Sequence, residues 1–135
     1  MKQTVLFLCT GNSCRSQMAE AMVNKFKGDR WQAYSAGTRP SGHVHPLSIE
    51  AIGELGISGD GLVSKSAETL RHIQFDRVYT VCDSAGEDCP IWLGTGSIMH
   101  VPFFDPDKAV GSDEDIMAVF RQVRDQIREQ IVETL

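Results

Sequence analysis

The chain has 135 residues, of which 41% are hydrophobic and 23% charged, and its formal net charge is −5. This length and composition suit a single domain spanning residues 1–135 with a sizeable core. The negative charge argues against nucleic acids or anionic membranes as partners, so an anionic substrate must be attracted by a local field.

The first predicted strand is the apolar run Thr4–Leu8, which is rich in strand formers. Such a run suits a strand that is buried on both faces, as in a parallel sheet. The next segment, Ser16–Phe26, has good helix formers and no breaker, and Met18, Met22 and Phe26 recur on one face. We therefore predict a strand, a tight loop and a helix.

The loop between this strand and helix has the features of an anion site. Its backbone amides have no strand partners, and the helix start adds a partial positive charge, which together suit phosphate or a similar oxyanion. Gly11 permits close backbone approach. Cys9 lies in this positive field, which favours a nucleophilic thiolate, and Arg15 can hold two oxyanion oxygens. The expected oxyanion-binding residues are Thr10, Gly11, Asn12, Ser13, Cys14, Arg15 and Ser16.

A structural interpretation of this loop is also open, because a cysteine that ends a buried strand is most often a small core residue. The strand before the loop and the helix after it favour the functional interpretation. We therefore predict a Cys9 thiolate that faces a bound oxyanion.

Strand and helix patterns alternate along the rest of the chain. The predicted elements are a strand at 31–36, a loop at 38–44, a helix from near Pro46 to Gly56, a short helix at 66–70 capped by Ser66, strands at 76–81 and about 98–101, and a last helix capped by Ser112. The last helix buries a stripe formed by Ile116, Phe120, Val123, Ile127 and Ile131.

This alternation predicts an α/β fold with a small four-stranded parallel sheet and helices on both faces. Ligands of such sheets bind at the carboxyl ends of the strands. Residues 9, 82 and 105 all follow predicted strands. We therefore expect one edge of the sheet to gather them.

The chain has four cysteines, at positions 9, 14, 82 and 89. No signal peptide or membrane-length apolar segment is visible, so we expect a cytoplasmic protein whose cysteines are catalytic or metal-binding. Cys82 follows a strand, and the small polar segment 83–88 can move without losing core burial. Cys82 could attack a modified Cys9, and Cys89 could carry the disulfide outward.

Other interpretations of these residues stay open. Cys82 could be a core residue and Cys89 an idle surface thiol. A zinc site lacks the usual Cys-x2-Cys pair, so no metal site is predicted. His43 and His45 flank a loop and are expected to be solvated residues instead of ligands.

The segment from Cys9 to Glu20, Cys-Thr-Gly-Asn-Ser-Cys-Arg-Ser-Gln-Met-Ala-Glu, contains Cys-x5-Arg. It resembles the signature of arsenate reductases built on the low-molecular-weight tyrosine phosphatase fold. The phosphatases themselves usually have proline where this chain has Gln17. The resemblance extends over nearly the whole chain, and the spacing of Cys82 and Cys89 is similar to that of the thioredoxin-coupled, three-cysteine arsenate reductases.

The resemblance implies reduction of arsenate to arsenite through a Cys9–arsenic adduct and a Cys9/Cys82/Cys89 disulfide relay that thioredoxin resets. Asp105 would supply the acid for the departing oxygen, although Asp-Pro alone indicates only a turn. Asn12 and Ser16 would hold the loop and tune the thiolate. No cofactor is expected, phosphate and sulfate are competing anions, and glutaredoxin stays open as the reductant.

Two other functions remain alternatives. A phosphatase would need only Cys9, Arg15 and Asp105, with water completing the reaction. A non-catalytic oxyanion-binding redox sensor would use the same disulfides without turnover. Product analysis separates the three functions, because they give arsenite, free phosphate or no product.

Lys65 marks a departure from some apparent relatives. Certain thioredoxin-coupled members bind potassium beside the anion loop, and the matching positions here are Asn12, Glu20 and Ser35, with Lys65 in place of an acidic residue. The resemblance implies that the Lys65 ammonium occupies the ion's space and pairs with Glu20. The plainer alternative is a solvated loop lysine.

Overall fold

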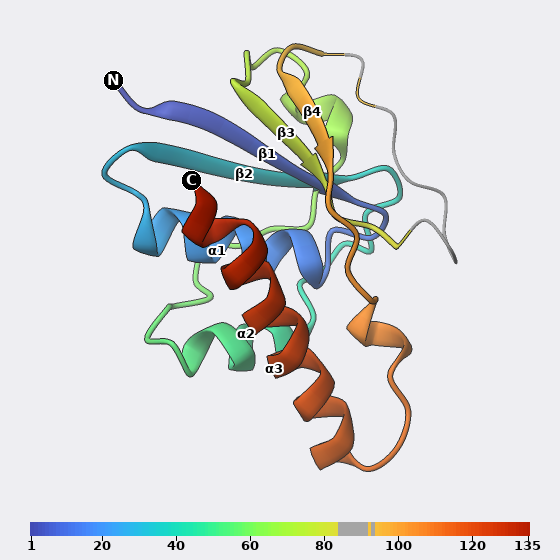
Figure 1. The fold of residues 1–135 in the computed structure, drawn as a ribbon. Helices are drawn as coiled ribbons and strands as arrows, with labels where there is room; N and C mark the ends of the chain where they lie inside the picture. Colours follow the sequence, from blue (N-terminus) through green and yellow to red (C-terminus); the bar gives the residue numbers. More distant parts are fainter. Residues whose placement is uncertain (84–91, 93) are drawn as a thin grey trace.

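The computed structural model describes residues 1–83, 92 and 94–135 (Figure 1). Strands and helices alternate as predicted, with boundaries that differ by a few residues. In chain order the elements are β1 (Gln3–Cys9), α1 (Arg15–Phe26), β2 (Trp31–Gly37), α2 (Pro46–Gly53), η1 (Ala67–Leu70), β3 (Arg77–Thr80), β4 (Ser97–His100), η2 (Pro106–Lys108), α3 (Asp113–Gln130) and η3 (Val132–Thr134). Here η denotes a 3₁₀ helix.

The four strands form a parallel sheet in the order β2-β1-β3-β4. β1 is therefore a central strand, with β2 on one side and β3 on the other. The chain leaves β1 toward one side and later returns to the other, so the carboxyl end of β1 is a topological switch point. Open α/β sheets bind their ligands at such points. The loop that follows Cys9 begins there.

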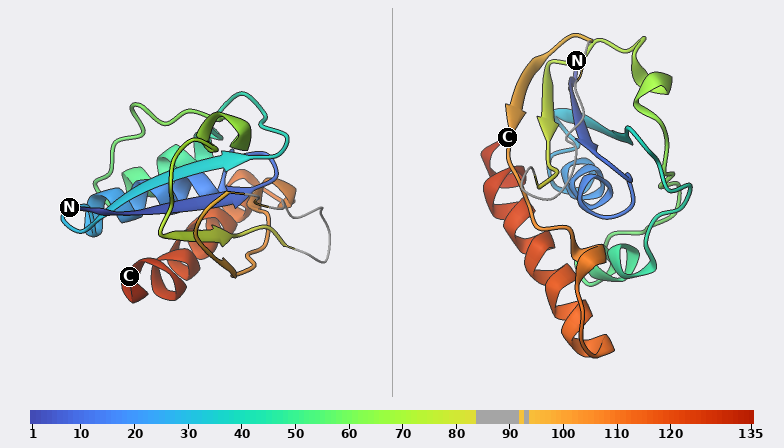
Figure 2. Two further views of the ribbon diagram at one scale, coloured as in Figure 1. Left: turned by 90° about the horizontal axis from the view of Figure 1, so that it is seen from above. Right: turned by 90° about the vertical axis from the view of Figure 1, so that its right-hand side faces the viewer.

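The two faces of the sheet are covered unequally (Figure 2). Val5 and Phe7 of β1 belong to the larger core, which is shared with α1, α2 and α3. Leu6 and Leu8 point to the opposite face, where the cover is η1 and residues near β3. The smaller core is completed by Ala36, Leu70, Phe75, Val78 and Trp92. The predicted four-stranded parallel fold with helices on both faces is confirmed, and within the described ranges the helical cover of the second face is the short η1.

Helix α3 follows its sequence pattern closely. Ser112 caps its start, and the Asp115 side chain bonds back to the Ser112 amide, which completes a capping box. Phe120, Val123 and Ile127 are buried as predicted. Although α3 has 18 residues, neither it nor any other helix in the described ranges is both long and apolar enough to cross a membrane.

The predicted apolar face of α1 is only partly buried. Met18 and Met22 are completely buried, whereas Phe26 in the last turn is 36% exposed. The guanidinium carbon of Arg128 lies 4.4 Å from the centroid of the Phe26 ring. The apolar face predicted for α1 therefore reaches the surface at its last turn, where the Phe26 ring makes this cation–π contact with α3.

Candidate functional site

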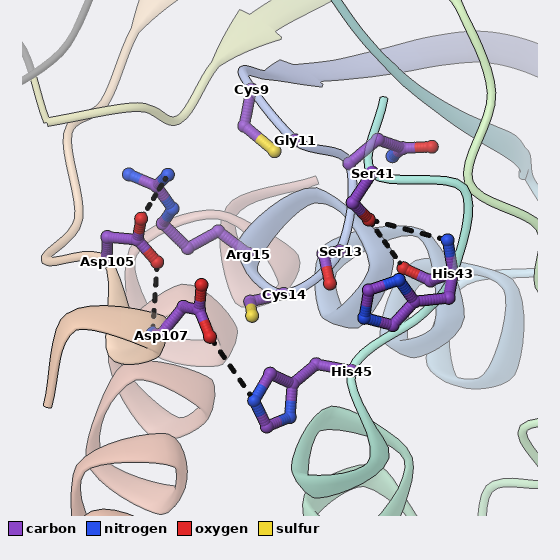
Figure 3. Close-up of a pocket in the computed structure, with 11 residues that line it drawn as sticks. Cys9, Gly11, Ser13, Cys14, Arg15, Ser41, His43, His45, Asp105 and Asp107 are labelled. Carbon is purple, nitrogen blue, oxygen red and sulfur yellow. Dashed lines mark hydrogen bonds and ion pairs between the residues drawn. The ribbon is translucent and has the colours of Figure 1, made fainter. Parts of the chain in front are cut away.

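The loop Cys9–Arg15 joins β1 to α1 and lines a pocket of about 120 Å³ (Figure 3). Cys9, Asn12 and Arg15 are buried, whereas Ser41 and His43 on the other side of the pocket are exposed. The pocket is therefore small and deep at the loop. Gly37, at the end of β2, lets the loop pack this closely, because a Cβ there would clash with the Thr10 carbonyl oxygen.

Every carbonyl oxygen of residues 10–14 accepts a hydrogen bond from a donor outside that segment. The donors and acceptors are Arg39 N to Thr10 O (3.0 Å), Ser41 N to Gly11 O (2.9 Å), Gln17 Nε2 to Asn12 O (3.0 Å), His45 N to Ser13 O (3.0 Å) and Met18 N to Cys14 O (3.0 Å). In a trans peptide the N–H points opposite to the C=O. The amides of residues 11–15 are therefore turned toward the inside of the loop.

These inward amides lie at the start of α1, a helix of 12 residues. Unpaired amides at a helix start carry partial positive charge and bind tetrahedral anions. Asn12 has a φ of 49°, in the left-handed region that few side chains adopt, and this conformation helps to curl the loop. The loop therefore has the geometry expected of an anion site, and the amides of residues 11–15 form its cradle.

The Cys9 side chain takes part in a buried hydrogen-bond chain. Its Sγ lies 2.9 Å from Ser16 Oγ, and Ser16 Oγ accepts a hydrogen bond from Asn12 Nδ2 at 2.8 Å. Because the Ser16 oxygen is already an acceptor, its hydrogen can be donated to the sulfur. A hydrogen bond donated to sulfur favours the thiolate over the thiol.

Cys14 lines the same pocket but has a different character. Burial raises the pKa of its thiol to about 12, and a hydrogen bond with Ser48 opposes the shift only in part. Cys14 is therefore protonated near neutral pH. Such a thiol is a poor nucleophile near neutral pH, because the thiolate is the reactive form.

Arg15 and Asp105 form an ion pair on one side of the pocket (Figure 3). Arg15 is 3% exposed, and its Nη1 donates to the Phe103 carbonyl at 3.2 Å. Its Nη2 lies 3.6 Å from Asp105 Oδ2. Asp105 caps η2, because its Oδ1 accepts from the Asp107 amide at 3.0 Å. The sequence-predicted cation and acid thus lie together beside the anion cradle.

Cys82 and Cys9 leave the sheet at the same edge. The parallel register pairs Leu8 with Thr80, and Val81 N donates to Leu8 O at 2.9 Å, so Cys82 follows the strand next to the one that Cys9 ends. Both residues belong to the larger core, and Cys82 is completely buried. Cys89, the third predicted relay residue, lies outside the described residues.

His45 and Asp107 form a pair at the pocket that the sequence pattern did not predict. His45 Nε2 lies 3.4 Å from Asp107 Oδ1, and its Nδ1 accepts from the Leu47 amide at 3.1 Å. The expectation that His43 and His45 are solvated residues instead of ligands stays a prediction; His43 is exposed, His45 is partly exposed, and both line the pocket. The two histidines follow β2, whose carboxyl end lies next to that of β1. This place in the sequence could have indicated that they reach the pocket. In the described ranges, no cluster of three or more His, Cys, Asp and Glu could hold a metal ion.

Lys65 pairs with Glu20 as predicted from the resemblance. Its Nζ lies 3.7 Å from Glu20 Oε1 and donates to the Val63 carbonyl at 3.0 Å. Ser35 Oγ also donates to Glu20 Oε1, at 2.9 Å. Burial raises the pKa of Glu20 above its ordinary value, while Lys65 and Ser35 oppose the shift. The ammonium thus provides a fixed cation among these oxygens.

This arrangement predicts that potassium gives no specific stabilisation. An ion that binds only the folded state at 100 times its dissociation constant would add roughly 2.7 kcal/mol. We expect equal melting temperatures in potassium, sodium and choline chloride at equal ionic strength. Lys65→Asp should acquire a potassium-specific rise, whereas Lys2→Asp, the same charge change at the exposed N-terminus, should not. A potassium-specific rise in the unmodified protein would contradict the prediction.

Comparison with known proteins relates this geometry to one family. The family model described as low molecular weight phosphotyrosine protein phosphatase matches residues 4–135. An arsenate reductase of Halalkalibacterium halodurans is 43% identical over 130 residues, which are 96% of this chain and 93% of that protein.

Solved structures agree with this relationship. An arsenate reductase in the phosphate binding state has a TM-score of 0.81 and 32% identity, covering 98% of this chain and 95% of the other. A thioredoxin-dependent arsenate reductase of Corynebacterium glutamicum has a TM-score of 0.66 and 26% identity, covering 96% of this chain and 60% of the other.

Proposed function

The chain belongs to the low molecular weight phosphotyrosine protein phosphatase family and is an arsenate reductase, and we propose that it works through Cys9, Cys82 and Cys89. The observation that carries the proposal is the cradle of inward amides around Cys9, whose sulfur lies 2.9 Å from the Ser16 hydroxyl. Thioredoxin is the proposed reductant, and its use by the Corynebacterium glutamicum relative supports this choice.

In the first step, arsenate binds to the loop amides and Arg15. Phosphate and sulfate compete for the same donors, since they are tetrahedral oxyanions of similar charge. The Cys9 thiolate attacks arsenic, so an S–As bond forms and an As–O bond breaks. Asp105 gives a proton to the departing oxygen, which leaves as water. The product is a covalent Cys9–arsenic adduct.

In the second step, Cys82 attacks the Cys9 sulfur. A Cys9–Cys82 disulfide forms while the S–As bond breaks, and the electron pair of that bond stays on arsenic. Arsenic is thereby reduced from the pentavalent to the trivalent state and leaves as arsenite, while the two cysteines are oxidised. The neighbouring exits of Cys9 and Cys82 from the sheet support this step.

The last steps return the enzyme to its starting state. Cys89 attacks Cys82, which frees Cys9 and leaves a Cys82–Cys89 disulfide. Two thiols of thioredoxin then reduce that disulfide by exchange and are themselves oxidised. No electron carrier other than cysteine sulfur is required within the chain.

The test of this function is multiple-turnover arsenate reduction with thioredoxin, thioredoxin reductase and NADPH. We expect equal amounts of arsenite formed and NADPH consumed. A parallel assay with glutaredoxin and glutathione identifies the preferred reductant. Release of phosphate from an aryl phosphate without arsenate reduction would favour the phosphatase alternative. Oxyanion binding without either product would favour the redox sensor.

Asp105→Asn should slow formation of the Cys9–arsenic adduct by roughly 10² to 10⁴, the range for a positioned acid. Oxyanion affinity should change little, because the loop amides and Arg15 remain. Rapid-quench measurement of adduct formation and calorimetry with phosphate separate the two effects. Asp60→Asn, the same change at an exposed position, is the control. Weaker phosphate binding with unchanged adduct formation would limit Asp105 to a structural turn.

A further inference from the structure

Gln17 is a buried polar residue that touches the pocket only through other residues. It lies in the first turn of α1 and is completely buried. Among the residues that line the pocket, Asn12 is its direct hydrogen-bond partner. Burying a glutamine is unfavourable unless its amide is well bonded. Its role must therefore lie in what it holds.

The Gln17 amide nitrogen is surrounded by three acceptors. Nε2 lies 3.0 Å from Asn12 O, 3.0 Å from Asn12 Oδ1 and 2.9 Å from Val63 O. Its Oε1, by contrast, is buried and has no hydrogen-bond partner among the residues that the structure describes. The position thus uses the donors of this amide and leaves its acceptor unsatisfied. A buried acceptor without a hydrogen bond is destabilising, so the donors of this amide must be what the position requires.

The first consequence concerns the anion cradle. Gln17 holds the Asn12 carbonyl on the helix side, and the planar trans peptide then directs the Ser13 N–H the opposite way. The other tethered carbonyls of the loop accept from backbone amides, whereas the Asn12 carbonyl accepts from this side chain. Gln17 therefore sets the direction of one cradle donor.

The second consequence concerns the nucleophile. Asn12 Oδ1 accepts from Gln17 Nε2 and from the Lys65 amide, at 3.0 and 2.9 Å. With the oxygen fixed, Asn12 Nδ2 points to Ser16 Oγ, and the Ser16 hydrogen is left for the Cys9 sulfur. The orientation of Gln17 therefore reaches Cys9 through two intervening side chains.

We propose that Gln17 is a positioning residue that orients both the Ser13 amide of the anion cradle and the Asn12–Ser16 chain to Cys9. This inference rests on the proposed roles of Cys9 and the loop. It needs neither arsenate turnover nor the other relay cysteines. Its test can therefore use phosphate as the anion and iodoacetamide as the thiol probe.

The test is Gln17→Met, which keeps the length of the side chain and removes its donors. We expect phosphate to bind about 10-fold more weakly by calorimetry, the effect of weakening one hydrogen bond to a charged ligand. Iodoacetamide should alkylate Cys9 less readily, which changes the pH profile of alkylation, because the hydrogen bond from Ser16 to the sulfur is loosened. Gln122→Met, the same change at an exposed position of α3, should alter neither value.

Two outcomes overturn the proposal. One is a Gln17→Met protein that melts at a lower temperature but keeps the phosphate affinity and the alkylation profile of the unmodified protein. The other is an unchanged phosphate affinity and alkylation profile in Gln17→Glu, which replaces the donors with a carboxylate of equal size. This second variant provides the test if the methionine variant fails to fold. Failure of the unmodified protein to bind phosphate or to alkylate at Cys9 would instead contradict the proposed function.

Discussion

Cys9→Ser is expected to abolish arsenate reduction and any hydrolysis of phosphate esters. The serine hydroxyl stays protonated near neutral pH and is a much weaker nucleophile than a thiolate, and it cannot form the disulfide that releases arsenite. Arsenite formation should fall to the level without enzyme, as measured over many turnovers with the complete thioredoxin system.

The same variant should still bind phosphate, because the loop amides and Arg15 are unchanged and Ser16 can hydrogen-bond to the new hydroxyl. Calorimetry with phosphate therefore serves as the control for folding. Turnover above background in a protein that binds phosphate normally would remove Cys9 from the role of nucleophile.

The second large effect is expected from the relay cysteines. Cys89→Ser should release about one arsenite per enzyme and then stop, because Cys82 can still attack the Cys9 adduct but nothing within the chain frees Cys9. Cys82→Ser should release almost no arsenite, since the S–As bond is then not cleaved by an internal thiol. A single-turnover assay without thioredoxin measures both yields.

Mass spectrometry after differential alkylation should find a Cys9–Cys82 disulfide in the stalled Cys89→Ser protein. Cys14 should remain reduced there, consistent with a pKa raised to about 12 by burial. Normal multiple turnover by both variants with thioredoxin would contradict the relay and favour the phosphatase alternative.

The parts of the fold that depend on neighbouring residues could be predicted from the sequence. The apolar run before Cys9 predicted β1, and Ser112 as a cap predicted the start of α3. Cys9 and Arg15 could be identified because a short loop between a strand and a helix places both by itself. The chemical roles of these two residues stay predictions.

Features that depend on contacts between distant residues were not predicted, or were predicted only in part. Gln17 bonds to Val63, 46 positions away, and His45 faces Asp107 from a loop that the sequence describes only as polar. Phe26 shares the apolar face of α1 in the sequence, but it is partly exposed and its ring contacts Arg128 on another helix. Helical periodicity gives the direction of a side chain but not which segment will pack against it.

The loop carbonyls are held outward by hydrogen bonds from residues beyond the loop. The anion site therefore cannot be transplanted as a short motif. Residues 9–16 grafted onto another strand–helix junction would keep Cys9 and Arg15 but lose the amides of Arg39, Ser41 and His45 that hold the loop carbonyls. A peptide of that sequence would let its carbonyls turn inward and repel the anion. The segment after β2 is therefore as much a part of the binding site as the loop itself, and a working graft must carry both.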